Sequence, residues 1–454
     1  MWEEWAEEGD SHQERNMFRK FRTFIFFLIA GVLLLFPSFN GDRWGLVREY
    51  NYRGWQTTSE RVVVARLAKS QQDGLFSAGG LLGLLDAEDG WAFGAEIANR
   101  QYELYETGEP IQFYLVYKSH PGFQGFVFGL FDSLTNFSSS VNLEIFRGSV
   151  ALASAVVIAL IAAGIAVEFG WLAAVLMLLF AAISEWMILP AGSLYWNLWA
   201  FFLPFVCGMF LLEKASGKND YPAFKIYFIL FSTALIKILF TGFEIITTAL
   251  VMATVPFVYV AVRDKWEWKS LLHRAPVLGI TLALATITGL GVLILQIAAA
   301  EGSLKSGLYY VSDTFNRRAA GNPDEYRGEY AESLGASHVE VIGKYLNTEA
   351  FYVGNVSVVY WHLIVAFALF TFLYFFKHRT TLRAASSNSG VALVVATWYS
   401  ILAPLSWFII FKPTAYIHTF LFPMAWQMPF VLLGFALCGY AIQNLLRSRT
   451  AQIT

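Results

Sequence analysis

Residues 57–61 (TTSER) form the first of two short polar segments whose residue types could carry out group transfer. The Glu60 carboxylate could accept a proton from an attacking hydroxyl or stabilise an oxocarbenium-like centre. Arg61, directly after it, provides a cation for an anionic substrate. The alternative is structural, because Thr57 and Glu60 have the spacing of a capping box at the start of a helix.

Residues 117–121 (YKSHP) form the second polar segment. Lys118 could bind a phosphate, with Tyr117 and His120 beside it as further substrate contacts. An anion at the start of a following helix also gains from the free amide groups there. The structural alternative is that Lys118 anchors the chain at a membrane interface with its long side chain.

A third polar group lies before the last apolar run. Lys412, Tyr416 and His418 bring a cation, a phenol and an imidazole into seven residues. An ionisable group beside an apolar run is costly and therefore indicates a site. Tyr416 is also what an aromatic belt at the membrane surface requires. We predict that all three contact substrate.

Glu244 is a fourth candidate for substrate binding, in a tight turn between two apolar runs. Lys237 lies seven residues earlier, which places both side chains on one face if a helix continues through the turn. A simple ion pair between the two side chains is the alternative prediction.

The amino-acid composition predicts that membrane-spanning helices position these residues. Of 454 residues, 56% are hydrophobic and only 15% are charged, and the mean hydropathy is +0.50. Soluble proteins carry about 25% charged residues, so the chain is predicted to be an all-α polytopic membrane protein. Cys207 and Cys438 lie in apolar runs and predict no disulfide. The sequence has no Gly-rich phosphate loop and no zinc-ligand spacing, and we expect no nucleic-acid partner.

About ten transmembrane helices are predicted, each with roughly 20 apolar residues. They cover residues 22–39, 148–168, 170–190, 193–212, 223–241, 244–262, 277–298, 357–376, 390–405 and 419–443. Clusters of Lys and Arg in alternate connections place both termini in the cytoplasm. Residues 1–21 and 444–454 are then cytoplasmic, and 22–443 form one transmembrane domain.

This topology leaves two long extracytoplasmic loops, residues 40–147 and 299–356. The first is rich in aromatic residues and should be folded. Within it we predict a helix over 57–68 and a short apolar helix over 122–131 that lies along the membrane surface. The mixed charges of 299–356 favour a solvated face, or a lid over the first loop.

The segment 57–68, followed by 117–121, resembles the first extracytoplasmic loop of GT-C fold glycosyltransferases. The layout is similar to that of the lipid A aminoarabinose transferases and protein O-mannosyltransferases. The resemblance implies a GT-C-like fold in which Glu60 is the catalytic carboxylate and Lys118 holds the phosphate of a polyprenyl-phosphate lipid. Ser59 stands where the family often has Asp, which leaves Asp42 or Glu49 as alternative catalytic carboxylates.

The function implied by the resemblance is transfer of a sugar from a polyprenyl-phosphate-linked donor to a glycan or glycolipid acceptor. Catalysis would take place on the extracytoplasmic face of a bacterial inner or plasma membrane. Some members of the superfamily use a divalent metal and others need none, so a metal cofactor stays open. A Wzy-type polymerase or ligase of lipid-linked glycans is an alternative enzyme, and a lipid or glycan transporter is the non-enzyme alternative. The assignment predicts that Glu60, Lys118 and His418 converge on one outward-facing cavity.

Overall fold

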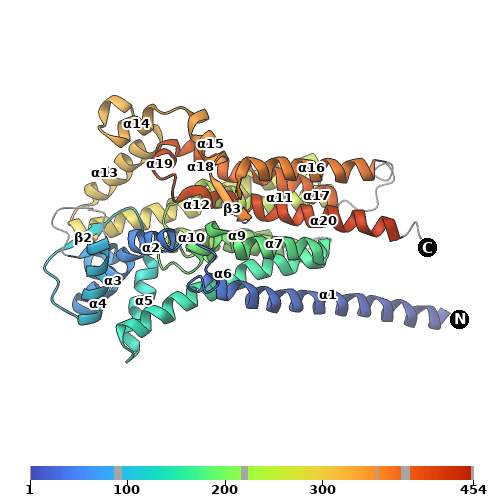
Figure 1. Ribbon diagram of the computed structural model, residues 1–454, viewed down its shortest axis with the longest axis horizontal. Coiled ribbons are helices and arrows are strands. Elements are labelled where there is room, and N and C mark those ends of the chain that lie inside the picture. The colour runs from blue at the N-terminus through green and yellow to red at the C-terminus, as the bar shows by residue number, and fades with distance from the viewer. Residues whose placement is uncertain (1, 86–94, 216–222, 354–355, 380–388, 451–454) are drawn as a thin grey trace.

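The structure is a computed structural model that describes residues 2–85, 95–215, 223–353, 356–379 and 389–450. Long helices run side by side, and both termini lie at the same end of the molecule (Figure 1). The long and bundle-forming helices are α1 (Trp2–Phe39), α6 (Ser139–Phe169), α7 (Trp171–Ile183), α8 (Glu185–Ala191), α9 (Leu198–Ala215), α10 (Ala223–Thr241), α11 (Ile246–Arg263), α12 (Trp268–Glu301), α16 (Tyr360–His378), α17 (Ser389–Ser400), α18 (Leu402–Ile410) and α20 (Phe430–Thr450).

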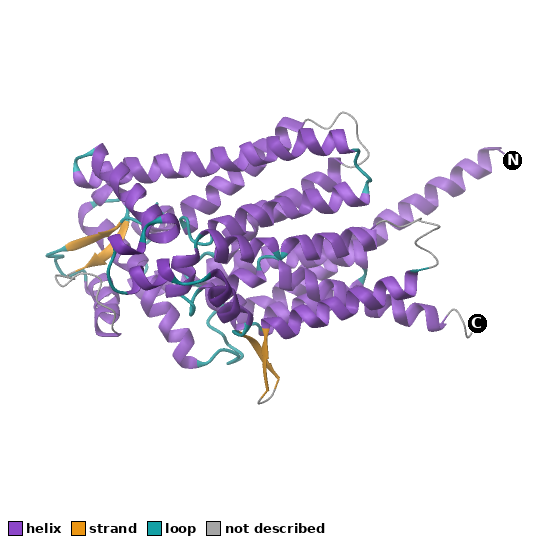
Figure 2. Cartoon of the chain, turned by 90° about the horizontal axis from the view of Figure 1, so that it is seen from above, coloured by secondary structure: helices purple, strands orange, loops and turns teal. Residues whose placement is uncertain are grey.

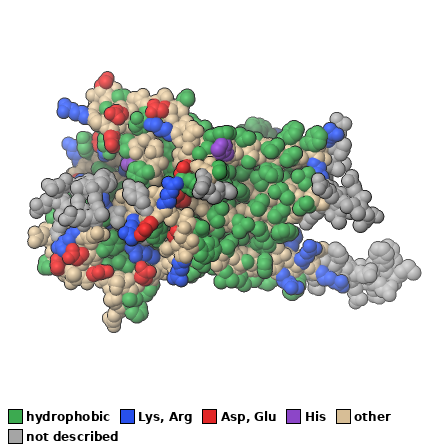
Figure 3. Space-filling view, viewed as in Figure 1, with side chains coloured by type: hydrophobic (Ala, Val, Ile, Leu, Met, Phe, Trp, Pro, Cys, Tyr) green, Lys and Arg blue, Asp and Glu red, His purple; other side chains and the backbone are tan. Residues whose placement is uncertain are grey.

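The apolar helices identify an all-α polytopic membrane protein. Seven helices in the described ranges are long and apolar enough to cross a membrane, or eight if the bent pair α7 and α8 is one span. The predicted total of about ten is therefore larger than the number that meets this criterion. α9 and α20 occupy the positions of two further predicted spans. Hydrophobic side chains cover the bundle in Figure 3, and charged side chains gather towards its two ends.

Two of the predicted spans are interrupted. The run 170–190 bends by 68° between α7 and α8, where Ser184 has an extended backbone conformation. The run 419–443 becomes an α-helix only at Phe430, after the 3₁₀ segment η5 (Phe422–Gln427). Pro423 lies inside η5 and Pro429 follows it, and neither has the backbone N–H that a continuous helix requires.

The end of the molecule opposite the termini, which we call the head, comprises the described parts of residues 40–138, 302–346 and 411–421 (Figure 1). Its first part contains α2 (Glu49–Trp55), η1 (Gln56–Glu60), α3 (Arg61–Asp73), η2 (Ser77–Gly80), β1 (Leu82–Leu85), α4 (Ala95–Thr107), β2 (Tyr114–Tyr117) and α5 (Phe123–Leu134). The other parts contain α13 (Leu304–Phe315), η3 (Asn316–Ala320), η4 (Pro323–Glu325), α14 (Glu329–Gly335), α15 (His338–Leu346) and α19 (Lys412–Ile417).

Two small two-stranded antiparallel sheets were not predicted (Figure 2). β1 pairs with β2, with Leu82 opposite Tyr117, and β3 (Glu349–Val353) pairs with β4 (Val356–Val359). β2 is the sequence YLVY, made of aromatic and aliphatic residues that suit a strand. The sheet of β1 and β2 fixes the position of Lys118, which directly follows β2.

The helix predicted over 57–68 starts earlier than expected. Residues Glu49–Asp73 are helical throughout, as α2, the π-helical turn η1 and then α3. No helix begins at Thr57, so the capping box predicted there is wrong, and no side chain caps η1 or α3. α3 is also no surface helix, because most of its side chains are buried in the head.

The apolar helix predicted over 122–131 is α5, which extends to Leu134. Phe123, Val127, Leu130 and Phe131 are exposed along it. The exposed apolar face is what a helix lying at a membrane surface requires.

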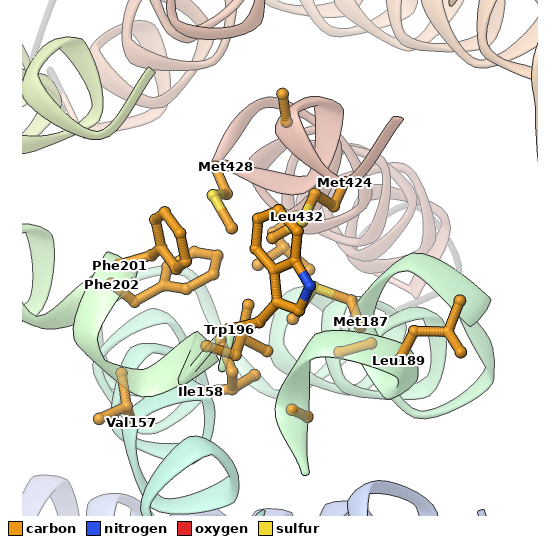
Figure 4. Packing of buried hydrophobic residues seen from close by; sticks show 14 of the residues in the cluster. Val157, Ile158, Met187, Leu189, Trp196, Phe201, Phe202, Met424, Met428 and Leu432 are labelled. Atoms are coloured by element: carbon orange, nitrogen blue, oxygen red, sulfur yellow. The ribbon is translucent and has the colours of Figure 1, made fainter. Parts of the chain in front are cut away.

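Trp196, in the connection between α8 and α9, anchors the core where the bundle meets the head. Its fully buried indole packs among Met187 of α8, Met424 and Met428 before α20, and Phe201 of α9 (Figure 4). Such dense packing fixes the orientation of the connection. The indole Nε1 donates a hydrogen bond to the Ser59 hydroxyl at 3.1 Å, which joins this core to the first loop.

Candidate functional site

A cavity of about 550 Å³ lies between the head and the bundle. Its walls come from segments that are far apart in the sequence and include both long loops. The lining residues are Thr58, Ser59, Arg61, Val62, Leu115, Val116, Tyr117, Lys118, Ser119, Tyr195, Trp196, Glu244, Tyr310, Arg317, Arg318, Tyr330, Thr414, His418, Phe420, Leu421 and Phe422.

Five of the predicted site residues meet in this cavity. They are Arg61, Tyr117, Lys118, Glu244 and His418. Lys118 and His418, two of the three residues predicted to converge, line this cavity, whereas the third, Glu60, does not. The loop 299–356 contributes Tyr310, Arg317, Arg318 and Tyr330, so it covers the first loop rather than standing apart in solvent.

The charged groups in the cavity favour an anionic ligand. Arg61, Lys118, Arg317 and Arg318 are basic, and Glu244 is the single carboxylate among the lining residues that the structure describes. The excess of fixed positive charge attracts phosphate or carboxylate groups, and arginine can bind them with two parallel hydrogen bonds.

Salt bridges hold two of these cations, Lys118 and Arg317, in place. The Lys118 ammonium pairs with the Glu301 carboxylate at the end of α12. Arg317 Nε lies 2.8 Å from Asp313 Oδ2. These partially exposed pairs are weak, so an anionic ligand can compete for the cations at little cost.

Arg318 connects the two long loops. Its Nη2 donates to the Ser119 hydroxyl at 3.3 Å, and its Nη1 lies 3.8 Å from Glu244 Oε1. Burial lowers the pKa of the guanidinium. The Glu244 carboxylate and the nearby tyrosines raise it, and together they outweigh burial, so the pKa lies above its ordinary value. Arg318 is therefore a permanent cation in the centre of the site.

Aromatic side chains make up much of the remaining wall. The Tyr117 and Tyr195 hydroxyls are 3.1 Å apart, and the Ser119 and Tyr310 hydroxyls are 2.7 Å apart. Burial and the Glu244 charge raise the pKa of Tyr117 to about 12, so its hydroxyl keeps its proton. Aromatic faces with hydroxyl groups between them suit a sugar ring or an isoprenoid chain.

His418 is a neutral member of the site. Burial and the positive charge of Arg318 lower the pKa of its imidazole to about 4. It therefore provides a hydrogen-bond donor and acceptor at neutral pH and adds no fixed charge.

This lowered pKa predicts that the protein loses stability in acid. The unfolded chain binds a proton at His418 near pH 6.5, whereas the folded chain binds it only near pH 4, so the free energy of unfolding falls as pH drops through this window. The slope for one such group is at most about 1.4 kcal/mol per pH unit. The unfolding midpoint in detergent, measured at pH 7.5 and 5, should fall less in His418→Gln than in the wild type. Equal falls in both proteins would contradict the assignment.

Glu60 lies outside the cavity, although Ser59 and Arg61 on either side of it line the wall. It is fully buried, and its Oε1 accepts hydrogen bonds from the Tyr102 hydroxyl at 3.1 Å and from Arg147 Nε at 3.0 Å. Its Oε2 accepts from the Leu194 backbone N–H at 3.3 Å. The carboxylate thus joins the first loop to α6 and to the connection after α8.

The two alternative carboxylates are also outside the lining residues. Asp42 accepts hydrogen bonds from the backbone N–H groups of Leu46 and Val47, at 3.0 and 2.8 Å, and so stabilises the turn after α1. Glu49 is exposed and pairs with Arg53 at 2.5 Å.

His120 lies behind the cavity wall. The ring is fully buried against Tyr195, and its Nδ1 accepts a hydrogen bond from the Gly122 N–H at 2.9 Å. Burial, with the charge of Lys237, lowers the pKa of His120 to about 3. A neutral, enclosed imidazole of this kind supports the residues around it.

Lys412 and Tyr416 likewise lie outside the lining residues and hold the head together. Lys412 Nζ donates to the carbonyls of Leu334 and Ala336 at 2.7 and 2.6 Å. The Lys344 ammonium lies 3.8 Å from the centre of the Tyr416 ring. These contacts fasten α14 and α15 to α19, next to the cavity.

Sequence reasoning missed Arg317 and Arg318 as site residues, because they lie in a loop of mixed charge that resembles a solvated face. Two adjacent arginines with one acidic residue four positions earlier were the available signal. Tyr195 and Trp196 had no distinguishing signal, since an aromatic belt predicts the same residues.

The described part of the chain contains no group of three or more His, Cys, Asp or Glu side chains arranged to hold a metal ion. The residues that line the cavity offer fixed cations, a carboxylate, hydroxyls and a neutral imidazole. No family model, no curated protein and no solved structure matches this chain.

Proposed function

We propose that the protein is a membrane glycosyltransferase that uses a polyprenyl-phosphate-linked sugar and transfers it to an acceptor at the head. The cavity lined by four basic residues and several aromatic rings, at the ends of apolar helices, is the observation that carries this proposal. A lipid-linked sugar phosphate combines an apolar chain, an anion and a hydroxylated ring, and each has a matching part of the wall. The resemblance of residues 57–68 and 117–121 to the GT-C loop agrees with this assignment.

In this proposal the donor phosphate binds between Lys118 and Arg318. The two residues flank Ser119, which Arg318 contacts directly. The sugar ring would lie against Tyr117, Tyr195 and Tyr310, which present hydroxyl groups and aromatic faces. The head lies on the extracytoplasmic side, in agreement with the distribution of Lys and Arg in the short connections.

The test is transfer by the purified protein in liposomes that contain a polyprenyl-phosphate sugar and candidate glycan acceptors. A glycosyltransferase yields a product enlarged by one sugar, whereas a polymerase or ligase joins a whole lipid-linked glycan. A transporter moves its substrate across the bilayer without altering it. Mass spectrometry of the products separates the three outcomes, and unaltered substrate throughout would refute the proposal.

Lys118→Ala is expected to weaken binding of the polyprenyl-phosphate donor about tenfold, because one charge-assisted contact to the phosphate is lost. The affinity can be measured by titrating donor into protein in nanodiscs. Lys344→Ala is the matched control, since Lys344 also forms a salt bridge in the head but does not line the cavity. Equal affinities for both variants and the wild type would show that Lys118 only anchors the chain.

A further inference from the structure

Glu244 occupies a position that the resemblance does not single out. It belongs to the turn between α10 and α11, it is 7% exposed, and its carboxylate faces the cavity beside Arg318. It is the one carboxylate among the described lining residues. Glu60, which the resemblance assigns to catalysis, instead has its oxygens bonded to Arg147, Tyr102 and a backbone amide behind the wall.

The backbone around Glu244 is held in a costly conformation. Ile245 has φ +40°, in the left-handed region, which is a true outlier for a β-branched side chain. Gly242 has φ +59°, and a Cβ there would come within 2.9 Å of the His120 ring. Strained backbone of this kind persists where the surroundings over-determine it and is frequent at functional sites.

Two buried side chains fix this turn from below. Lys237 Nζ donates to the carbonyls of Gly242 and Glu244 at 3.0 and 2.8 Å. His120 packs against Gly242 from the first loop. Lys237 thus contacts the backbone of the turn, which leaves the Glu244 carboxylate directed at Arg318 and the cavity.

We propose that Glu244 is the catalytic carboxylate, with Lys237 and His120 as positioning residues; this inference rests on the proposed transferase function. The acceptor hydroxyl oxygen forms a bond to the anomeric carbon, and the bond from that carbon to the donor phosphate oxygen breaks. The phosphate leaves with the electron pair, and the hydroxyl proton passes to Glu244. Arg318 stabilises the negative charge on the leaving phosphate and keeps the carboxylate oriented.

The experiment is the liposome transfer assay with Glu244→Gln. We expect kcat to fall by a factor of about 100 or more, in the range for loss of a general base, while donor affinity changes less than threefold. Glu340→Gln is the matched control, because Glu340 is an exposed carboxylate of the head that pairs with Lys344 outside the cavity. Its kcat should equal that of the wild type.

Glu244→Asp keeps a carboxylate at this position, so it tests whether the loss of turnover in Glu244→Gln results from misfolding. It should retain measurable turnover with an acidic limb in the pH profile of kcat, and Glu244→Gln should lose that limb. If Glu244→Gln keeps the wild-type turnover and the acidic limb of the pH profile, the assignment of Glu244 is overturned but the proposed transferase function is not. Absence of any transfer by the wild type would overturn the transferase function and this inference together.

Discussion

Glu60→Ala is expected to lower the free energy of unfolding by about 3 kcal/mol, because it leaves a mostly buried cation without its partner. The Arg147 guanidinium is 22% exposed and donates two hydrogen bonds to the fully buried Glu60 carboxylate. The Tyr102 hydroxyl and the Leu194 N–H lose their acceptor in the same substitution. The cost is larger than for a surface pair, which contributes about 0–1 kcal/mol.

The chain contains a matched control for this prediction. Glu144 contacts the same Arg147 at 3.1 Å, but its side chain is 72% exposed. Glu144→Ala should therefore cost less than about 1 kcal/mol. The unfolding free energies can be measured by denaturant titration in detergent micelles. A Glu60→Ala protein as stable as Glu144→Ala would show that the buried pair contributes little, and would return Glu60 to the set of catalytic candidates.

The resemblance and the structure single out different carboxylates: the resemblance points to Glu60, whereas Glu244 lines the cavity. Residues 57–61 resemble the family pattern except at Ser59, yet the π-helical turn η1 directs Ser59 and Arg61 to the cavity and Glu60 away from it. A π turn has five residues where an α turn has four, so it changes which side chains share a face. The sequence carries no signal for such a turn.

Much of the membrane fold could be predicted, because apolar runs of about 20 residues are required by the thickness of the bilayer. The break between α7 and α8 was not predicted, although the polar residues Ser184 and Glu185 interrupt the apolar run there. The two-stranded sheet of β1 and β2 was missed for a different reason. Its strands have four residues each and are separated by a helix, so neither shows enough alternation to indicate a strand.

Part of the candidate site was predicted from polar and charged residues that lie next to apolar segments. Lys118 was predicted from the resemblance and from its place before a short apolar helix, and His418 from its place beside an apolar run; both line the cavity. His120 and Lys412 were predicted as members of the same two polar segments, but their contacts are directed at backbone groups inside the head. Side-chain direction depends on tertiary packing, which spacing in the sequence does not specify.

Lys237→Met is expected to lower the free energy of unfolding by about 2–3 kcal/mol, although the two side chains are similar in length. Lys237 is 1% exposed and was predicted to pair with the Glu244 carboxylate; its ammonium instead donates to two carbonyls of the turn. Methionine would leave the buried Gly242 and Glu244 carbonyls without a donor, which costs about 1–3 kcal/mol each before relaxation.

The exposed Lys225 near the start of the same helix provides the control, and Lys225→Met should be nearly neutral. Hydrogen exchange followed by mass spectrometry should show faster exchange over residues 240–246 in Lys237→Met than in Lys225→Met. Since the strained turn carries Glu244, its loosening should also lower kcat while donor affinity stays within about threefold. Unchanged exchange and unchanged kcat would mean that the turn keeps its conformation without the lysine, and Lys237 would then be only a buried anchor of α10.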